Sequence, residues 1–349
     1  MQKLDKLDLN SLTKNELKTL VQQWNQPSFR ATQLYQWIHQ KGVHDPNQMG
    51  NIPKAMISKL IQHYRLAPVS IKRTQISDDG TQKYLFSLDD HETIETVLIS
   101  EKSRNTVCVS SQVGCAMGCT FCATGLQGFL RNLTAGEITA QGEHVQRLLQ
   151  IANQGHVTNI VFMGMGEPLA NYDNLLRAIS ILNDPLGLNI GMRRVTISTC
   201  GIVPKIYQLA KDSNQVNLAI SLHAPDDNKR SEVMPINQRY PISEVLDACQ
   251  FYVEKTNRRV SFEYALIHGF NDTQADLSQL VEILSNLLCH VNVIPVNPVN
   301  DDFQRPTSKQ VIAFVDYLQN HNIPASVRRE RGTDIAAACG QLRQAQQEG

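Results

Sequence analysis

The sequence lacks long hydrophobic runs, net charge and low-complexity segments. No apolar stretch in the 349 residues approaches the roughly 20 residues of a membrane-spanning helix. The first ten residues are polar and charged, unlike a secretory signal. We therefore expect a soluble, cytoplasmic protein with no membrane partner. The 33 basic and 33 acidic residues cancel, so overall charge identifies no partner, and no repeat of 20–50 residues indicates a solenoid.

Hydrophobic residues and cysteines are abundant. The hydrophobic fraction of 42% excludes wholesale disorder, and the length suits one large α/β barrel plus a small accessory domain. Eight cysteines in an intracellular chain favour metal or redox chemistry over a disulfide scaffold. Residues 1–68 carry nine Lys and Arg against four Asp and Glu. This excess suits a polyanion such as RNA, but a solvated helical surface explains it equally well.

The hydrophobic pattern divides the chain into three parts. Residues 1–68 predict short helices, with Leu17, Leu20, Val21 and Trp24 on one face and Ile57, Leu60, Ile61 and Tyr64 on another. Residues 69–104 alternate like strands around a turn at 78–80 and predict a small β extension. Residues 105–349 alternate strands with amphipathic helices. Six strand–helix units and a closing strand predict an α/β fold with a partial, parallel (β/α)6 barrel.

The predicted elements of the barrel have these ranges. The strands are Thr106–Ser110, Asn159–Met163, Arg194–Ser198, Val216–Ser221, Val260–Leu266, His290–Pro295 and Ser326–Arg329. The main helices are Ala135–Ile151, Ser243–Lys255, Asp276–Leu287 and Lys309–Gln319. Chemistry in such barrels gathers on the loops after the strands. Five of these loops carry unusual residues: the cysteine cluster 115–122, Gly-Met-Gly-Glu-Pro (164–168), Ser198-Thr199, Ser221-Leu222-His223 and Asn297-Pro298.

Cys115, Cys119 and Cys122 place three thiolates within eight residues. Three cysteines leave one iron of a 4Fe-4S cluster without a protein ligand, and S-adenosylmethionine (SAM) can chelate that iron, whereas ferredoxin clusters use four cysteines. A zinc site would need a fourth ligand, and none lies nearby at zinc spacing. The motif therefore predicts one 4Fe-4S cluster and SAM rather than zinc or structural thiols.

Several other residues allow two interpretations. Gly166 and Glu167 form either an ordinary turn or a place where backbone and carboxylate approach the SAM ammonium group. By context alone Cys108 and Cys339 resemble core residues, as do Cys200, Cys249 and Cys289. Glu95 is a lone acid in an apolar strand, either on the surface of an edge strand or turned inward as a base. The basic pairs 193–194, 258–259 and 328–329 either line a phosphate-facing rim or are merely solvated.

Together these motifs resemble the radical SAM adenine carbon-2 methyltransferases, which modify 23S ribosomal RNA and, in some members, transfer RNA. The resemblance covers nearly the whole chain. It rests on Cys-Val-Ser-Ser-Gln-Val-Gly-Cys (108–115), Gly-Met-Gly-Glu-Pro (164–168), Ile-Ser-Leu-His-Ala-Pro (220–225), Met-Pro-Ile-Asn (234–237), Asn-Pro (297–298) and Asp-Ile-Ala-Ala-Ala-Cys-Gly-Gln-Leu (334–342).

The resemblance implies a role for each candidate residue. Cys339 would accept a methyl group from one SAM, and a radical made from a second SAM would activate that methyl group for addition to adenine. Cys108 would release the product by attacking Cys339, leaving a disulfide that an external reductant must open. Glu95 would accept the ring proton. The residues expected to hold SAM are Gly166, Glu167, Ser198, Ser221, Leu222, His223 and Asn297.

The resemblance also implies partners and leaves rivals. The expected partners are 23S ribosomal RNA and an electron donor such as flavodoxin or ferredoxin, with transfer RNA as a second substrate left open. Residues 1–68 would help to bind RNA, and nothing in the sequence predicts more than a monomer. One rival is a carbon-8 adenine methyltransferase that confers antibiotic resistance, which would share the cysteines. The other is a non-catalytic RNA-binding protein with a structural metal.

Overall fold

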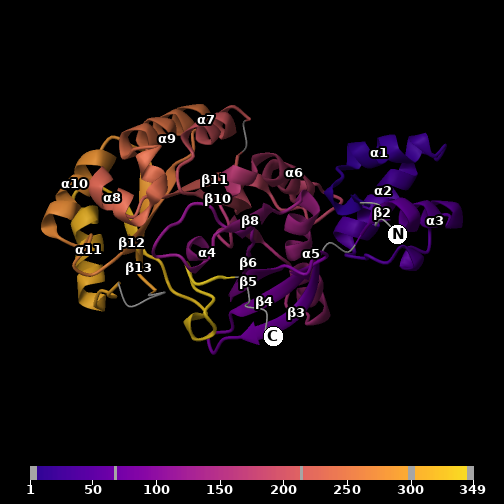
Figure 1. The fold of residues 1–349 in the computed structure, drawn as a ribbon, viewed down its shortest axis with the longest axis horizontal. Helices are drawn as coiled ribbons and strands as arrows, with labels where there is room; N and C mark the ends of the chain where they lie inside the picture. The colour runs from indigo at the N-terminus through magenta and orange to yellow at the C-terminus, as the bar shows by residue number, and fades with distance from the viewer. Residues whose placement is uncertain (1–5, 67–68, 213–214, 298–302, 344–349) are drawn as a thin grey trace.

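A ten-stranded mixed sheet organises most of the chain in the computed structural model, which describes residues 6–66, 69–212, 215–297 and 303–343 (Figure 1). The strand order is β14-β13-β12-β11-β10-β9-β6-β5-β4-β3. Neighbouring strands from β6 to β14 are parallel. They are β6 (Arg104–Cys108), β9 (Asn159–Phe162), β10 (Val195–Thr199), β11 (Asn217–Ser221), β12 (Val260–Leu266), β13 (Cys289–Pro295) and β14 (Ala325–Val327).

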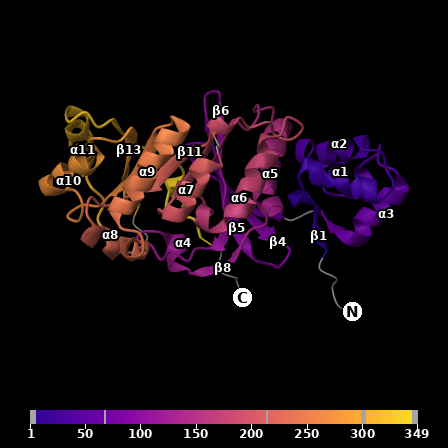
Figure 2. The same ribbon diagram turned by 90° about the horizontal axis from the view of Figure 1, so that it is seen from above.

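Helices cover the outer side of this parallel sheet (Figures 1 and 2). Three of them begin with a threonine capping box, which satisfies backbone N–H groups of the first turn. The α/β barrel is confirmed, with each predicted strand end within two residues and each predicted helix end within three. The helices between the strands are α5 (Ala135–Ile151), α6 (Tyr172–Asn183), α7 (Val203–Lys211), α8 (Asp227–Val233), α9 (Ile242–Thr256), α10 (Gln274–Leu284) and α11 (Ser308–Asn320).

Three antiparallel strands extend the sheet beyond β6. They are β3 (Val69–Ile76), β4 (Gln82–Leu88) and β5 (Thr93–Glu101), and β5 pairs antiparallel with β6. The segment read as a β extension is therefore continuous with the barrel sheet. A short helix and two small strands surround the cysteine loop: β7 (Gln112–Gly114), α4 (Ala123–Leu126) and β8 (Phe129–Asn132).

The N-terminal helices form a separate core against α6. Leu17, Leu20 and Val21 are buried there, as the helical pattern predicts. The face predicted for the helix near residue 60 is partly wrong. Leu60 is buried as predicted, but Ile61 is 43% exposed and Met56, which was not predicted, is buried. The elements are β1 (Leu7–Asp8), α1 (Lys14–Gln23), α2 (Phe29–Tyr35), the π-helix η2 (Gln36–Gln40), α3 (Lys54–His63) and β2 (Tyr64–Arg65).

None of the helices in the described residues is both long and apolar enough to cross a membrane. Short 3-10 helices connect several of the elements above. The 3-10 helices are η1 (Leu9–Ser11), η3 (Pro46–Gln48), η4 (Pro168–Asn171), η5 (Met192–Arg194), η6 (Pro235–Gln238) and η7 (Thr333–Ile335).

Candidate active site

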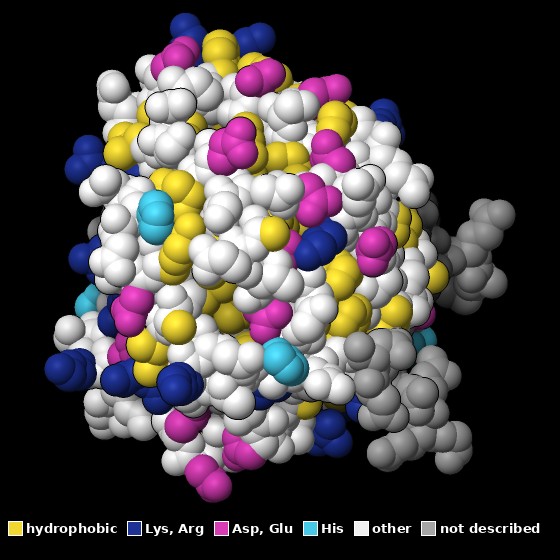
Figure 3. Space-filling view, turned by 90° about the vertical axis from the view of Figure 1, so that its left-hand side faces the viewer, with side chains coloured by type: hydrophobic (Ala, Val, Ile, Leu, Met, Phe, Trp, Pro, Cys, Tyr) yellow, Lys and Arg dark blue, Asp and Glu magenta, His cyan; other side chains and the backbone are white. Residues whose placement is uncertain are grey.

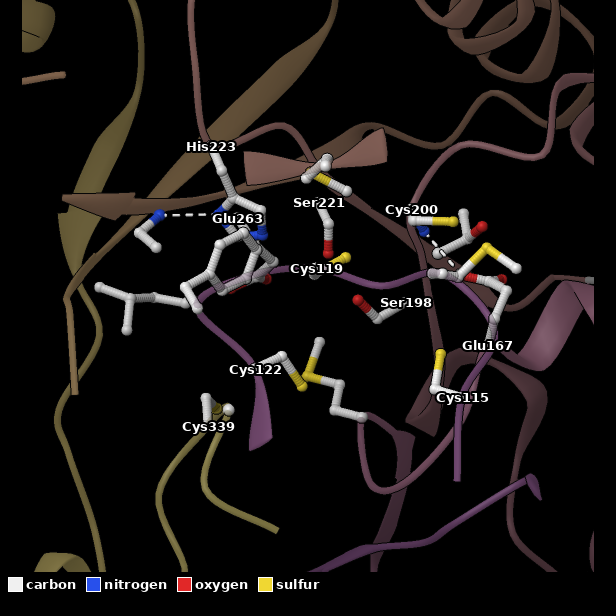
Figure 4. Close-up of a pocket in the computed structure, with 18 of the residues that line it drawn as sticks. Cys115, Cys119, Cys122, Glu167, Ser198, Cys200, Ser221, His223, Glu263 and Cys339 are labelled. Atoms are coloured by element: carbon white, nitrogen blue, oxygen red, sulfur yellow. Dashed lines mark hydrogen bonds between the residues drawn. The ribbon is translucent and has the colours of Figure 1, made fainter. Parts of the chain in front are cut away.

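A pocket with about 940 Å³ of empty space, open solvent included, lies where the parallel strands end (Figure 4). Its lining comes from segments more than 200 residues apart in sequence. Most of the site residues expected from the sequence contribute to its wall: Cys115, Cys119, Cys122, Gly166, Glu167, Ser198, Ser221, His223, Asn297 and Cys339. Three expected residues are not part of this wall: Glu95, Cys108 and Leu222.

The cysteine loop owes its shape to glycine. Gly114 has φ of +72°, and a Cβ there would lie 2.0 Å from the Gly128 carbonyl oxygen. The next residue, Cys115, donates its backbone N–H to the same carbonyl at 2.8 Å. The loop can therefore close against Gly128 only because residue 114 has no side chain. Figure 4 shows the side chains of Cys115, Cys119 and Cys122 around the pocket.

The three cysteines suit a cluster better than a single ion. Among the described residues, no group of three His, Cys, Asp or Glu side chains is close enough to hold one metal ion. A zinc site would bring its sulfurs to about 2.3 Å from one point, whereas a 4Fe-4S cluster assigns each cysteine to a different iron. Burial raises the pKa of the Cys115 thiol to about 12, so a metal must displace a tightly held proton on binding.

A fourth cysteine, Cys200, also lines the pocket, although its sequence context suggested only a structural role. Its backbone N–H donates to Glu167 Oε2 at 2.8 Å, and its thiol also hydrogen-bonds the Glu167 carboxylate. The Cys200 thiol is thus directed at Glu167. Cys249 and Cys289 are buried in the main core, as expected.

Gly166 and Glu167 follow β9 and face the same pocket. Gly166 has φ of +99°, and a Cβ there would lie 2.5 Å from Gln112 Cβ, so this position requires glycine. Glu167 accepts backbone N–H groups through both oxygens, from Leu169 at 2.9 Å and from Cys200 at 2.8 Å. Burial raises the pKa of this carboxyl, and the same backbone donors oppose that shift.

His223 is neutral, and its orientation is fixed. Its Nδ1 accepts the backbone N–H of Ala265 at 2.8 Å, so the ring proton resides on Nε2. Burial, with a smaller contribution from Arg230, lowers the pKa of His223 to about 3. The backbone has φ of +60°, which is uncommon for a residue with a side chain, and Asn271 Nδ2 secures it by donating to the His223 carbonyl at 2.7 Å.

The remaining expected SAM contacts occupy different positions. Ser198, next to the last residue of β10, and Ser221, the last residue of β11, line the pocket. Leu222 is fully buried and lies behind the wall. Asn297 lines the pocket and accepts from Arg305 at 3.1 Å through Oδ1. Pro298, its neighbour in the motif, lies outside the described residues.

Arg230, which no sequence motif singles out, holds the pocket wall together. It is fully buried, and its guanidinium donates to the carbonyls of Cys200 at 2.7 Å and Ser221 at 3.1 Å. A third carbonyl, that of Leu222, accepts from Nε at 3.1 Å. Arg230 therefore ties together the ends of β10 and β11. It lies in the charge-rich segment 226–232, a pattern typical of a solvent-facing helix.

The C-terminal segment brings Cys339 to the pocket (Figures 1 and 4). The carbonyl of Gly340 accepts from the backbone of Ala123 at 2.7 Å, next to the cysteine loop. Thr124 Oγ1 donates to the Leu342 carbonyl at 2.5 Å. Cys339 itself is exposed. The segment therefore presents a reachable thiol beside the three cysteines, which its small-residue context did not suggest.

Cys108 is buried at the end of β6 and belongs to the main core. Burial raises the pKa of its thiol to about 12, and the proximity of Cys339 adds to that shift. All eight cysteines lie within the described residues and are free thiols. The structure therefore contains no disulfide between Cys108 and Cys339, which are neighbours; the disulfide that the resemblance implies is one formed during turnover.

Glu95 is inside the protein, so the surface interpretation of this residue is wrong. It is also not a lone acid: Oε1 lies 2.9 Å from Lys83 Nζ, and both side chains are at most 7% exposed. Oε2 accepts the backbone N–H of Arg343 at 3.0 Å, while Lys83 donates to the Ala336 carbonyl at 3.1 Å. Glu95 thus anchors the segment that carries Cys339.

Comparisons with known proteins agree with this arrangement. Residues 109–282 match the Radical SAM superfamily, and residues 7–66 match the ribosomal RNA large subunit methyltransferase N-terminal domain. The fold and the three-cysteine pocket therefore define a radical SAM enzyme.

Full-length relatives narrow the assignment further. A probable dual-specificity RNA methyltransferase RlmN from Clostridium perfringens (strain SM101) is 48% identical over 333 residues, 95% of each chain. One from Geobacillus kaustophilus is 49% identical over 335 residues, covering 95% of this chain and 91% of the relative. A radical SAM methyltransferase structure from Sphaerobacter thermophilus aligns with a TM-score of 0.93 and 47% identity, over 97% and 99% of the two chains. The chain belongs to the RlmN family of radical SAM RNA methyltransferases.

Proposed function

We propose that this enzyme methylates carbon 2 of an adenosine in 23S ribosomal RNA, and that transfer RNA is a second substrate. One observation carries the proposal: the cluster cysteines and Cys339 line the same pocket although more than 200 residues separate them in sequence. A radical SAM enzyme needs the three cluster cysteines. A thiol that carries a methyl group would account for Cys339 in the same pocket. The dual-specificity name of the relatives supports the two RNA substrates.

Cys115, Cys119 and Cys122 would hold one 4Fe-4S cluster, and Gly166, Glu167, Ser198, Ser221, His223 and Asn297 would surround SAM. When bound, cluster and SAM supply the 5′-deoxyadenosyl radical that removes hydrogen from an unactivated methyl group. The Glu167 carboxylate suits an ammonium group, because its backbone donors fix its orientation. The neutral His223 offers an N–H donor at Nε2. Leu222 would support SAM only from behind the wall, through packing.

Cys339 would accept the methyl group first. Its exposed thiol faces the pocket, so its sulfur can attack the SAM methyl carbon and release S-adenosylhomocysteine. Transfer of one hydrogen atom from the S-methyl group to the 5′-deoxyadenosyl radical would leave a methylene radical that adds to carbon 2 of adenine. The ring radical would return one electron to the cluster, and carbon 2 could then release its proton. Cys108 would attack the sulfur of Cys339, forming the disulfide as the Cys339 sulfur–carbon bond to the product breaks. An external thiol would then restore both cysteines.

Glu95 would accept the proton from carbon 2. To do so its carboxylate must exchange a contact with Lys83 or with the Arg343 backbone, since both oxygens are bonded and the residue does not line the pocket. The proposal therefore requires the C-terminal segment to shift when RNA binds. Such a shift would couple RNA binding to proton removal.

The N-terminal unit, residues 1–68, would grip folded RNA, and the barrel of residues 105–349 would carry out the chemistry. The N-terminal unit has an excess of basic residues and matches the ribosomal RNA large subunit methyltransferase N-terminal domain, and both observations support this division. We further propose that the enzyme acts as a monomer and receives its electron from a flavodoxin or a ferredoxin.

The test is incubation of cluster-reconstituted enzyme with SAM, dithionite and unmodified 23S ribosomal RNA without oxygen, followed by nucleoside mass spectrometry. The expected product is 2-methyladenosine. An 8-methyladenosine product would place the enzyme with the carbon-8 group. No methylated adenosine beside abundant 5′-deoxyadenosine would refute 23S ribosomal RNA as the substrate. Parallel reactions with transfer RNA decide the second substrate.

Two cysteine variants test the thiol roles in the same assay. Cys108→Ala should accumulate a covalent protein–RNA adduct, because nothing then cleaves the bond to Cys339. Cys339→Ala should lose methyl transfer yet retain the cluster absorbance of the wild-type enzyme. Free product from the first variant, or methylation by the second, would contradict the assigned roles. Cys249→Ala, which changes a core thiol outside the pocket, is the matched control.

A further inference from the structure

A second cavity lies inside the barrel, toward the amino-terminal ends of the strands, with about 1720 Å³ of empty space, open solvent included. Closed barrels fill this region with bulky branched side chains. Here the inward-facing positions hold mostly small polar residues, which cannot form an apolar core and leave the barrel hollow. They are Thr106, Asn159, Thr196, Asn217, Ser261 and Asn292.

Arginine dominates the charge of this cavity. Five arginines line it against two glutamates, Glu101 and Glu263. Three of the arginines are paired with these acids: Arg328 with Glu263 at 3.0 Å, and both Arg104 at 3.2 Å and Arg331 at 2.8 Å with Glu101. The remaining two are Arg259, which precedes β12, and Arg329, which follows β14.

Arg259 and Arg329 are exposed, and neither makes an ion pair or a side-chain hydrogen bond within the part of the chain that the structure describes. Glu101 attracts Arg329 through space without forming an ion pair with it. Arginine side chains that line a polar cavity and make no ion pair are available for an anion from outside. Arg259 and Arg329 belong to the basic pairs 258–259 and 328–329, for which the sequence allowed either a phosphate-facing rim or a solvated surface. The pair Arg193 and Arg194, in contrast, is exposed but does not line the cavity.

The arginine cavity and the active-site pocket share one wall, in which Arg328 donates to Glu263 at 3.0 Å and contacts the Met163 sulfur at 3.3 Å. Met163, Glu263 and Arg328 line both spaces. A smaller cavity between them is lined by Arg328, Arg329 and Cys339 together. A ligand bound by Arg329 therefore lies beside the wall that carries the reactive thiol.

Other routes by which RNA could reach the active-site pocket are less favourable. The C-terminal segment closes the pocket next to α4, where Ala123 and Thr124 bind its carbonyls. On the face formed by α10 and α11, acidic and basic side chains are interspersed without a large patch of one sign (Figure 3). The arginine cavity combines an excess of positive charge with a wall that it shares with the pocket of Cys339.

We propose that this cavity is the entrance for the RNA strand that carries the target adenosine, with Arg259 and Arg329 binding the phosphates that flank it. This inference rests on the proposed function and adds the route by which RNA reaches Cys339. Arginine binds phosphate oxygens bidentately and fixes the position of a strand without reading its sequence. The small polar residues of the barrel wall supply hydrogen-bonding groups for the sugar and base.

The test is RNA binding by Arg259→Ala/Arg329→Ala at several salt concentrations, with Arg193→Ala/Arg194→Ala as the matched control for charge. Two lost phosphate contacts lower the slope of log affinity against log salt by about 1.4–1.8, which corresponds to roughly 15- to 30-fold weaker binding at 0.15 M salt. KM for RNA should rise in parallel. Methylation of Cys339 by SAM, measured by mass spectrometry of the protein without RNA, should match the wild type and shows that the variant is folded.

Wild-type affinity and salt slope in the cavity variant would overturn the proposal, and so would an equal loss in the control pair. Arg259→Lys/Arg329→Lys should recover part of the affinity, because charge remains while the bidentate contact is lost. The proposed function fails separately. If the wild-type enzyme methylates Cys339 but no adenosine, the reaction assignment is wrong, whereas an active wild type with an unaffected cavity variant refutes only the entrance.

Discussion

Replacing Lys83 by methionine should release the segment that carries Cys339. Lys83 contacts the Glu95 carboxylate at 2.9 Å and the Ala336 carbonyl at 3.1 Å. Methionine has a similar length and no charge, so the change removes the cation without opening a large cavity. It leaves a buried carboxylate whose remaining hydrogen-bond donor, among the described residues, is the Arg343 backbone N–H.

The magnitude follows from the burial of the pair. Both side chains are at most 7% exposed, and removing one partner of a buried ion pair costs about 3–5 kcal/mol. One lost contact joins β4 directly to Ala336, and undocking of residues 336–343 would let water reach the carboxylate of Glu95 that loses its cation. The cost therefore falls on the docking of that segment. A loss of about 3 kcal/mol raises the population of the undocked segment roughly 150-fold.

Hydrogen exchange measures this opening directly. The backbone N–H of Ala337 donates to the Gly332 carbonyl at 2.8 Å and exchanges only when the segment opens. Its exchange should accelerate by roughly 100-fold or more in Lys83→Met and much less in Lys83→Arg, which retains the charge. Adding Glu95→Gln to Lys83→Met should slow exchange again, since no unpaired charge remains. Wild-type exchange in Lys83→Met would refute the argument that this pair docks the segment.

Three further outcomes follow from the structure. Gly166→Ala should weaken SAM binding, measured by equilibrium dialysis, and lower the free energy of unfolding by about 1–3 kcal/mol, because the new Cβ would lie 2.5 Å from that of Gln112. The control Gly50→Ala, where a Cβ has no atom within 4 Å, should change neither quantity. Burial, aided by His44, lowers the pKa of His144 from 6.5 to about 4, so the unfolded state binds the proton first as the pH falls. The free energy of unfolding should therefore decrease between about pH 6.5 and pH 4, by about 2 kcal/mol at pH 5, and an equally steep decrease in His144→Gln would contradict this. Arg230→Lys should cost about 2–4 kcal/mol in a denaturation experiment, because three carbonyls lose their shared donor, and an unchanged transition would show that those bonds contribute little.

The sequence predicted those features that depend on short-range pattern. Alternation of β-rich runs with amphipathic stretches sufficed for the parallel sheet, because period and turn residues are local signals. The cysteine loop was predictable for the same reason, since Cys115, Cys119 and Cys122 fall within eight residues. The helix of residues 54–63 shows the limit. Its apolar residues surround more than one face, and only packing decides that Met56 is buried and Ile61 exposed.

Contacts between distant segments could not be predicted in this way. Lys83 and Ala336 are 253 residues apart, and no local pattern indicates that a lysine of one strand will neutralise Glu95 and also bind the C-terminal segment. The charged neighbours of Arg230 in the sequence are typical of a solvent-facing helix, yet Arg230 is fully buried. The pocket role of Cys200 likewise depends on Glu167, 33 residues away.

These long-range contacts explain why the antiparallel strands belong to the catalytic unit. Ser77 Oγ donates to Asp334 at 2.5 Å, and Asp79 accepts the backbone N–H of Gly332 at 3.1 Å. With the Lys83–Glu95 pair, β3 to β5 and their turn hold both ends of residues 332–343. In the proposed mechanism the Cys339 thiol meets SAM, then a radical, then a base, and this sequence requires a segment that docks firmly and can still shift. Fastening that segment through polar contacts rather than an apolar core provides this, because each contact can be exchanged for one with bound RNA.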